Sequence, residues 1–441
     1  MAYRIKLIPG IIVLILILPI IYLTYDRSLI PPAPTWTSPD YVPGETWEQY
    51  ATRYLQISKQ PNALEHYLNA FSSLTVDPYN KGWSSLRPIL NSGWDKEYPE
   101  VEKLLTLNQK AIQEILTGTK LPYREFPPSP FGEKSPDFSV AYEKMQPLGN
   151  LIALAGKKSE HDSRFRDAME FYLAGIKFGK EISQKTQYFN FMLNGISMMN
   201  TNARALLELT KSGKLPVTDY RQIIQELDKV EREQITYADE IEAMYREIYT
   251  RDYYHTAHPI QYYNELHPEA KGREFTGIQN YSKSYCVSYI YFNRGRILAD
   301  DYNFFNDMLK SETRKSNPES TVNKMKVREP QNNYFNTKTI TYLVAGLASL
   351  QREVTLLRLA QLEAAIQTYR LEKKQWPNSQ DDLKSYLQPI PLDPYTDKPF
   401  LWTKNSANQP IIYSFGPDRA DNMAKLVYDP TNGTISNGDI F

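Results

Sequence analysis

Hydrophobic residues in the last quarter of the chain recur at helical spacing over an unusually long stretch. They alternate in steps of four and three residues, which places them along one face of a helix. The first five positions of this face are Leu343, Leu347, Leu350, Val354 and Leu357. Because the pattern continues to Leu371, it predicts one long helix that cannot be buried on every side and must lie with one face against another element.

The end of this helix is marked by residues that stop helices. Lys373 and Lys374 suit the negative C-terminal end of a helix, and Pro377 cannot continue one. Ser379 and Asp382 then form the S-x-x-D pattern of a helix start. We therefore expect a short second helix after residue 379. Its inward positions are Leu383, Tyr386 and Leu387.

The residues after this second helix predict a small antiparallel sheet. Phe400 to Thr403 and Ile411 to Phe415 alternate like half-buried strands, and Asn405 to Pro410 is the loop between them. A second hairpin is expected to pair Leu426 to Tyr428 with Thr434 to Ile435. The C-terminal region, residues 339–441, is thus expected to be a small α+β domain built on the long helix.

Several short motifs in this region occur in an order that is typical of one family. They are Ala365, Tyr369-Arg370, Trp376-Pro377, Leu383, Tyr386-Leu387, Pro391, Asp393-Pro394-Tyr395, Pro399-Phe400, Tyr413-Ser414-Phe415-Gly416-Pro417-Asp418 and Gly438-Asp439-Ile440. In this order they resemble the globular domain of the type II secretion pseudopilins, and of the major pseudopilin, type II secretion protein G, in particular. The resemblance implies a pseudopilin-like fold for residues 339–441.

The resemblance does not extend to the N-terminus. Pseudopilins begin with a processed Gly and an apolar helix that carries a Glu at its fifth position. After Gly10 this chain reads Ile11 to Ile15 without that Glu. Since that Glu pairs with the neighbouring subunit, we do not expect this chain to polymerise.

The resemblance also implies a calcium site in the loop that follows the last strand of the hairpin. Calcium prefers several oxygen ligands, and the corresponding side chains are Asp418, Asp421 and Asp439. The loop departs from the family because Arg419 stands where a Gly is expected. The alternative is a solvated acidic turn in which Asp418 bonds to its own backbone.

The N-terminal segment has the composition of a membrane span. Ile11 to Leu23 is apolar and approaches the minimum spanning length. Arg4 and Lys6 precede it, which favours a cytoplasmic N-terminus. No small-residue cleavage site follows, so we expect an uncleaved anchor at residues 1–28 rather than a signal peptide. These features predict a single-pass protein of the bacterial inner membrane with an extracytoplasmic body.

Between the anchor and the C-terminal domain we expect a spacer, a helical body and a linker. Prolines recur between Leu29 and Gly44, which predicts a semi-rigid spacer that holds the body off the membrane. Residues 45–310 have helical periodicity, and residues 311–338 are polar like a linker. The expected helices are Glu45 to Ser58, Pro61 to Ser73, Pro99 to Leu116, Phe138 to Ala155, Arg164 to Ser183, Phe189 to Leu209, Val217 to Tyr249 and Lys283 to Leu309.

The fold class that follows is mostly α, with a single N-terminal transmembrane helix and a small C-terminal α+β domain. Within the body, Asn62 to Phe71 and Arg166 to Gly175 resemble the helices of tetratricopeptide pairs, although no regular period is kept. A concave surface that binds protein or peptide and an irregular bundle without a groove are both consistent with this pattern.

Charge and cysteine content narrow the classes of function. Lysine plus arginine equals aspartate plus glutamate at 51 each among 441 residues, so no net charge draws the chain to nucleic acid. Cys286 is the only cysteine, which excludes an intramolecular disulfide. The sequence contains no G-x-S-x-G motif, phosphate-binding glycine loop or C-x-x-C pair. Without these motifs, the sequence identifies no small-molecule substrate, and calcium is the only candidate cofactor.

One cluster has the residue types of a metal site. Asp252, His255, His258, Glu265 and His267 lie close together in the sequence, and imidazoles at this spacing could bind one metal ion. The His-Pro pairs at 258–259 and 267–268 favour a loop here, so polar loop histidines are the alternative.

We therefore expect a non-enzymatic scaffold or protein-binding module that is associated with a type II secretion or pilus-like machine. The alternatives are a true pseudopilin-like secretion subunit and a metal-dependent hydrolase that uses the His255 to His267 segment.

Overall fold

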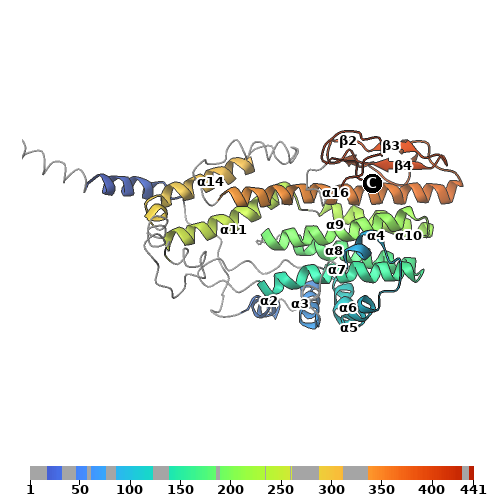
Figure 1. The fold of residues 1–441 in the computed structure, drawn as a ribbon, viewed down its shortest axis with the longest axis horizontal. Coiled ribbons are helices and arrows are strands. Elements are labelled where there is room, and N and C mark those ends of the chain that lie inside the picture. The colour runs from blue at the N-terminus through green and yellow to red at the C-terminus, as the bar shows by residue number, and fades with distance from the viewer. Residues whose placement is uncertain are drawn as a thin grey trace, which may run out of the picture.

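The fold is described from a computed structural model of the chain. This structure describes residues 17–31, 46–56, 61–75, 86–122, 139–184, 189–233, 235–258, 260, 288–310, 336–429 and 437–441. The molecule is elongated and mostly helical, with two small two-stranded sheets (Figure 1). An N-terminal helix, residues 17–28, lies at one end, and the sheets lie near the other.

Three long helices form the centre of the helical body. They are α7 (Ser139–His161), α8 (Phe165–Ser183) and α9 (Phe189–Lys211). Short connections join consecutive helices, which makes neighbours antiparallel. The backbones of α8 and α9 touch where Gly179 faces Gly195, because a Cβ atom added to Gly195 would lie 2.3 Å from the carbonyl oxygen of Gly179. These two glycines therefore set the spacing of the two helices.

Shorter helices precede α7 in the chain, and most of them contact it. They are α2 (Trp47–Gln56), α3 (Ala63–Ser73), α4 (Arg87–Ser92), α5 (Pro99–Leu107) and α6 (Gln109–Gly118). The sequence predicted one helix from Pro99 to Leu116, and this prediction is wrong. The chain breaks at Asn108 because its side-chain amide donates to the Leu104 carbonyl at 3.0 Å while its oxygen accepts from the Thr75 backbone at 3.0 Å.

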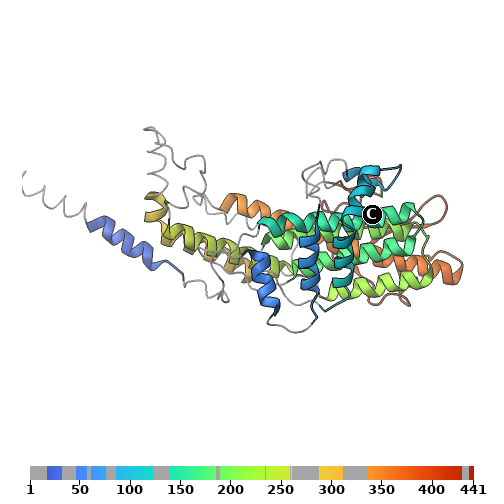
Figure 2. The same cartoon turned by 90° about the horizontal axis from the view of Figure 1, so that it is seen from below.

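The predicted helix Val217 to Tyr249 is also two helices, α10 (Val217–Arg232) and α11 (Tyr237–Ala257). A new helix start separates them. The carboxylate of Asp239 accepts the backbone N–H of Thr236 at 2.7 Å, and the Thr236 hydroxyl accepts the N–H of Asp239 at 3.2 Å. This reciprocal pair satisfies donors of the first turn of α11. α11 pairs with α14 (Arg294–Lys310), and Figures 1 and 2 show the two helices projecting from the body as one arm.

The predicted long helix is confirmed as the single helix α16 (Asn336–Lys373). It begins before the predicted domain boundary at residue 339. The expectation that it could not be buried on every side is wrong for the middle of the helix, because almost every residue from 355 to 368 is buried, whereas its last two residues are exposed. α9 and α10 cover α16 from the body, and the C-terminal residues cover it from the opposite side (Figure 1). Its start packs on α9, α11 and α14 through Leu347 and Leu350.

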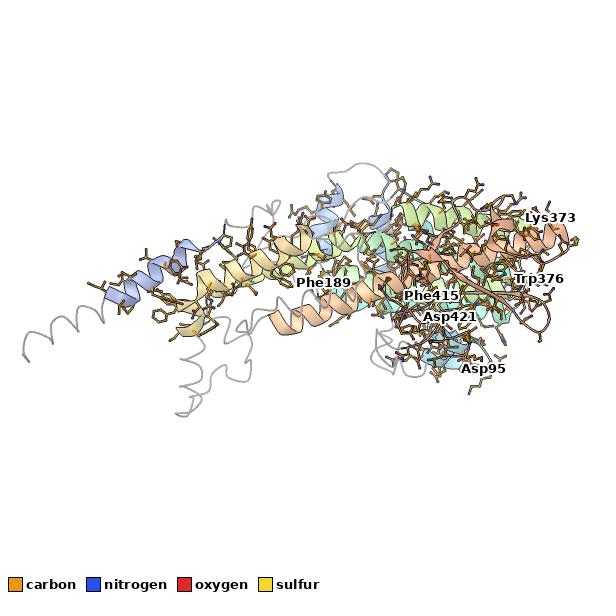
Figure 3. The ribbon with its side chains drawn as sticks, turned by 90° about the horizontal axis from the view of Figure 1, so that it is seen from above. Asp95, Phe189, Lys373, Trp376, Phe415 and Asp421 are labelled. Carbon is orange, nitrogen blue, oxygen red and sulfur yellow. The ribbon has the colours of Figure 1, made fainter. Side chains whose placement is uncertain are left out.

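The segment after α16 agrees in part with its prediction. Lys374 has a left-handed φ of 57° directly after the last helical residue, as expected for a helix end. The expected second helix is only a 3-10 turn, η5 (Gln380–Leu383), in which the Asp382 carboxylate accepts the backbone N–H of Asn378 at 2.7 Å. Leu383 and Leu387 are buried, and Tyr386 is half-buried. Lys373 and Trp376 lie at the end of the molecule that is remote from the N-terminal helix (Figure 3).

The first predicted hairpin is confirmed. β3 (Leu401–Lys404) and β4 (Pro410–Tyr413) pair antiparallel, and β1 (Leu392–Asp393) pairs with β2 (Lys398–Pro399) beside them. The second predicted hairpin stays a prediction, although Val427, one of its expected strand residues, makes a parallel bridge to Asp439. Its expected partners, Thr434 and Ile435, lie outside the described residues.

The described residues of the C-terminal region share a hydrophobic core with the helical body. Leu383, Tyr395, Phe400 and Ile412 belong to the same buried cluster as residues of α8, α9, α10 and α16. α16 therefore joins the body and the C-terminal region through one continuous core. Of the predicted linker, residues 311–335 lie outside the described residues and residues 336–338 are already part of α16.

Within the described part of the chain, no helix is both long enough and apolar enough to span a bilayer. The predicted span begins at residue 11, and residues 1–16 lie outside the described part. Residues 32–44 of the predicted spacer lie outside it as well.

Candidate binding cleft

A cleft of about 340 Å³ lies where three parts of the chain meet. α9 forms one wall between Ser197 and Lys211, and Arg352 and Leu356 of α16 form a second. Residues 427–428 and 439–441 form the third wall, and α4 closes one end. We call this site the α9–α16 cleft. Its residues come from positions more than two hundred apart in the sequence, and they meet only because α16 packs on α9.

A buried asparagine fixes the two helices at the base of the cleft. The side-chain amide of Asn200 donates to the carbonyl of Ser349 at 3.1 Å and to that of Ile196 at 3.0 Å. Its oxygen accepts the Nε–H of Arg352 at 3.1 Å. Asn200 therefore holds α9 in register with α16 and orients the Arg352 guanidinium, whose planar group suits a carboxylate.

The charged side chains of the cleft are mostly cationic. Arg204, Lys211 and Arg352 line it, together with the carboxylates of Glu208 and Asp439. Glu208 is compensated, since its Oε2 lies 2.9 Å from Lys157 Nζ and its Oε1 lies 3.5 Å from Arg204 Nε. Burial lowers the pKa of Lys211, and Arg204 is shared with Glu208, so Arg352 is the cation best placed to meet an anionic group. Because Lys157 also pairs with Glu208 from outside the lining, cations still exceed carboxylates here.

The third wall adds apolar surface. Val427 is exposed, and the backbone around it is held by the Tyr428 N–H, which donates to the Asp439 carbonyl at 2.9 Å. Phe441 stacks on Tyr413 with ring centroids 5.5 Å apart, and Lys211 Nζ lies 5.9 Å from the centroid of the Phe441 ring. Apolar and cationic groups thus line the same opening.

The structure brings the three predicted calcium ligands together, with Asp418 and Asp421 in one loop and Asp439 in the C-terminal segment beside it. Asp418 accepts the backbone N–H of Ala420 and that of Gly438, each at 3.0 Å. The first of these bonds confirms the turn in which Asp418 bonds to its own backbone. Asp439 is buried and accepts the N–H groups of Asn422 at 3.2 Å and Ala424 at 2.9 Å.

Asp421, the third predicted ligand, accepts the Met423 N–H at 2.7 Å and the Tyr413 hydroxyl at 3.2 Å. Burial raises the pKa of Asp439, backbone N–H donors oppose the rise, and the nearby Asp421 and Asp418 add to it. The loop lies over the middle of the body, where Figure 3 labels Asp421. All three carboxylates thus hold the backbone of their own loop, and calcium binding there stays a prediction.

The predicted histidine cluster is only partly described. α11 continues to Ala257, so the expectation of a loop is wrong for residues 252–257, and residues 261–267 of the segment lie outside the described part. A proline restricts mainly the residue before it, and Pro259 follows the helix end by two positions. Asp252 is buried, His258 is exposed, and the side chain of His255 lies outside the described part, as do Glu265 and His267.

Across the described residues, no group of three or more His, Cys, Asp or Glu side chains could hold a metal ion. A metal-dependent hydrolase at the His255 to His267 segment therefore stays a prediction that these residues do not test.

The sequence did not reveal the structural role of two residues that organise this region. Asn200 lies in the apolar pattern of α9, and a polar residue at a core position is the signal that could have found it. Asp393 was noted only as part of a family motif. Its buried carboxylate accepts the Ser414 hydroxyl at 3.0 Å and the N–H groups of Tyr395 and Phe415 at 2.9 Å each.

A scan against protein-family models found no match, and searches of curated proteins and of solved structures found no significant match either. Function must therefore be inferred from the residues and the geometry of this chain.

Proposed function

We propose that this protein is a non-enzymatic scaffold of a bacterial cell envelope, anchored in the inner membrane by its N-terminal segment. In this proposal it binds a polypeptide segment of a partner protein in the α9–α16 cleft. The observation that carries the proposal is the excess of cations, beside apolar side chains, in an opening that three parts of the chain build together.

The dimensions and chemistry of the cleft fit a peptide better than a folded surface. A volume of about 340 Å³ is at the lower end of the range for ligand sites and accommodates a few side chains. Arg352 and Arg204 could each bind a carboxylate, while Leu207, Leu356 and Val427 offer apolar contacts. A short acidic segment with one or two apolar side chains would satisfy both features.

The anchor is supported by the surface of the N-terminal helix. Ile17, Leu18, Ile20 and Ile21 are all exposed, although soluble surfaces rarely gather large apolar residues in this way. They continue the apolar run that starts at residue 11 in the sequence. A bilayer would bury this surface, with the helical body outside the cytoplasm.

The test is a selection of peptides on the full chain, purified in detergent and immobilised. A phage-displayed library of random peptides should yield ligands that carry Asp or Glu beside apolar residues. Changing Arg352→Gln or Arg204→Gln should weaken their binding roughly tenfold or more, since a hydrogen bond to a charged group contributes about 1.5–3 kcal/mol. Lys384→Gln, an exposed cation outside the cleft, is the matched control and should change nothing.

The proposal fails if no peptide is selected. It also fails if the selected peptides bind the two arginine variants as tightly as the unchanged protein.

A second candidate is a pseudopilin-like subunit of a secretion machine. It is favoured by Asp393, because this carboxylate joins two of the family-like segments, Asp393-Pro394-Tyr395 and Tyr413 to Asp418. Co-purification of secretion components from detergent-solubilised membranes, together with melting that shifts when calcium is chelated, would support this candidate. It would be excluded if no such component co-purified and Asp418→Asn melted like the unchanged protein with and without chelator.

A further inference from the structure

The N-terminal helix is joined directly to the arm formed by α11 and α14. The Asp26 side chain is almost completely buried, and its carboxylate accepts the backbone N–H of Gly295 at 2.8 Å and that of Arg296 at 3.0 Å. These donors belong to the first turn of α14, which has no partner for them within the helix. Asp26 therefore caps α14 from the other end of the sequence and complements the positive end of its dipole.

Neighbouring contacts strengthen this junction. The Tyr22 hydroxyl donates to Asn293 Oδ1 at 2.7 Å, and Arg27 Nη2 donates to the Tyr291 carbonyl at 2.9 Å. The backbones are in contact, since a Cβ atom on Gly295 would lie 1.5 Å from the Asp26 carbonyl oxygen. The start of α14 must therefore follow the end of the N-terminal helix. This contact joins the N-terminal helix to the arm directly, in addition to the predicted Pro-rich spacer that follows the helix in the sequence.

The position of Asp26 in the sequence determines how deep in the membrane the junction lies. It is the first charged residue after the apolar run from residue 11. Once the apolar run lies in the hydrocarbon core, Asp26 and Arg27 reach the headgroup region, where charged groups are hydrated. The first turn of α14, held by Asp26, then lies at the same level.

The arm exposes side chains that are suited to the headgroup region of a membrane. Tyr291 is 50% exposed and Phe292 39% exposed at the start of the α14 region, and Ile260 is 59% exposed just beyond the end of α11. Arg294 packs against α11 through the Tyr253 carbonyl at 3.3 Å, and Arg296, two residues further on, is exposed. Aromatic side chains and arginines are the residues that gather at the membrane–water interface.

We infer that the tip of the α11–α14 arm, formed by Ile260, Tyr291, Phe292 and Arg296, is a second membrane-contacting surface that rests on the lipid interface. The inference rests on the proposed membrane anchor. In this arrangement the arm stands on the bilayer and joins the anchor to the helical body, and Figures 1 and 2 show the N-terminal helix, the arm and the body in this order. The occupant of the exposed surface is lipid, because the contacts of Tyr22 and Arg27 with Asn293 and Tyr291 place this surface directly beside the proposed anchor.

The experiment measures membrane depth at single sites of the full chain. Cys286→Ser removes the only cysteine, and a cysteine is then introduced by Phe292→Cys, Ile20→Cys or Met423→Cys for labelling with an environment-sensitive fluorophore. The labelled chains are reconstituted into vesicles of three parts phosphatidylcholine and one part phosphatidylglycerol, with and without lipids that carry a nitroxide on the acyl chain. Met423 is exposed in the C-terminal loop and is the matched control.

Nitroxide lipid should quench the probes at positions 20 and 292 and leave the probe at 423 unchanged. Adding Asp26→Ala should reduce quenching at 292 while quenching at 20 persists, because the arm is no longer held at the level of the anchor.

Quenching at 20 together with a probe at 292 that behaves like the one at 423 would overturn the inference and leave the anchor intact. Absence of quenching at both 20 and 292 would overturn the anchor and the inference together. A probe at 292 that is shielded only at high protein concentration, without quenching, would identify a second copy as the occupant and also overturn the inference.

Discussion

Glu181 should make the stability of this protein fall as the pH rises through the weakly acidic range. Its side chain is buried in α8, accepts the Tyr67 hydroxyl and lies 4.0 Å from Lys177 Nζ. Burial raises the pKa of Glu181 to about 7, although Tyr67, Lys177 and Lys180 oppose the rise. The ordinary value for this group, 4.5, applies to the unfolded chain.

The sign follows from proton binding in the two states. Below about pH 4.5 the carboxyl is protonated in both states, so the protonated form contributes its full stability. Between about pH 4.5 and 7 the unfolded chain releases the proton while the folded protein keeps it, so the free energy of unfolding decreases. At 1.36 kcal/mol for each pKa unit, the loss amounts to about 3 kcal/mol and is complete above about pH 7.

The measurement is urea unfolding of the full chain in detergent, followed by helical circular dichroism between about pH 4 and pH 8. Glu181→Gln cannot ionise and should lack the loss, so above pH 7 it should be more stable than the unchanged protein. Glu170→Gln alters an exposed carboxylate on the same helix and should follow the unchanged protein. The reasoning is refuted if Glu181→Gln shows the same dependence on pH as the unchanged protein.

Three further substitutions test packing and buried polar contacts. Gly195→Leu should separate α8 from α9 and destabilise the protein by about 3 kcal/mol or more, because overpacking at a backbone contact forces the helices apart. The effect is measured as a lower unfolding midpoint. An unchanged midpoint would contradict the close approach of the two helices. Asp393→Asn should cost about 1–3 kcal/mol by leaving the N–H of Tyr395 or Phe415 without its acceptor, with faster hydrogen exchange confined to residues 392–416. Asp26→Ala should destabilise the protein by about 1 kcal/mol, because α14 loses its N-terminal cap. Hydrogen exchange should become faster in the first turn of α14 and stay unchanged in β3 and β4. For Asp393→Asn or Asp26→Ala, faster exchange throughout the protein would contradict the local role given to that residue.

The elements that the sequence predicted correctly are those whose signals are local. The seam from Leu347 to Leu357 predicted α16, and Lys373, Lys374 and Pro377 predicted where it ends. Helix breaks were missed where a side chain competes with the backbone, as at Asn108 and Thr236, because periodicity continues through such positions. Hydrophobic spacing reports one face of a helix and cannot show that another element covers the opposite face.

The burial of α16 illustrates this limit. Its second face is polar, yet Gln351 and Thr355 are buried, and Gln351 Nε2 donates to the Pro394 carbonyl at 2.8 Å. A hydrogen bond to a distant segment makes a polar residue suitable for a core position, and the sequence does not reveal that partner.

The candidate cleft could not be predicted from the sequence either, because its residues come from distant segments of the chain. Arg352, Arg204 and Val427 come from α16, α9 and the C-terminal region, and none belongs to a motif. By contrast, the acidic loop of Asp418, Asp421 and Asp439 could be located from the family resemblance, because its residues are close in the chain and in a fixed order. The cap of α14 by Asp26 joins residues at a separation that no local pattern indicates.

The most direct test of the proposed scaffold is photo-crosslinking in the native envelope. A photoreactive amino acid replaces Val427, which is exposed on the wall of the cleft, or Met423, which is exposed outside it. We expect illumination to join position 427, and not position 423, to one partner polypeptide through a segment that carries Asp or Glu, and Arg352→Gln should abolish the adduct. No adduct at 427, or the same adducts at both positions, would contradict binding in the cleft.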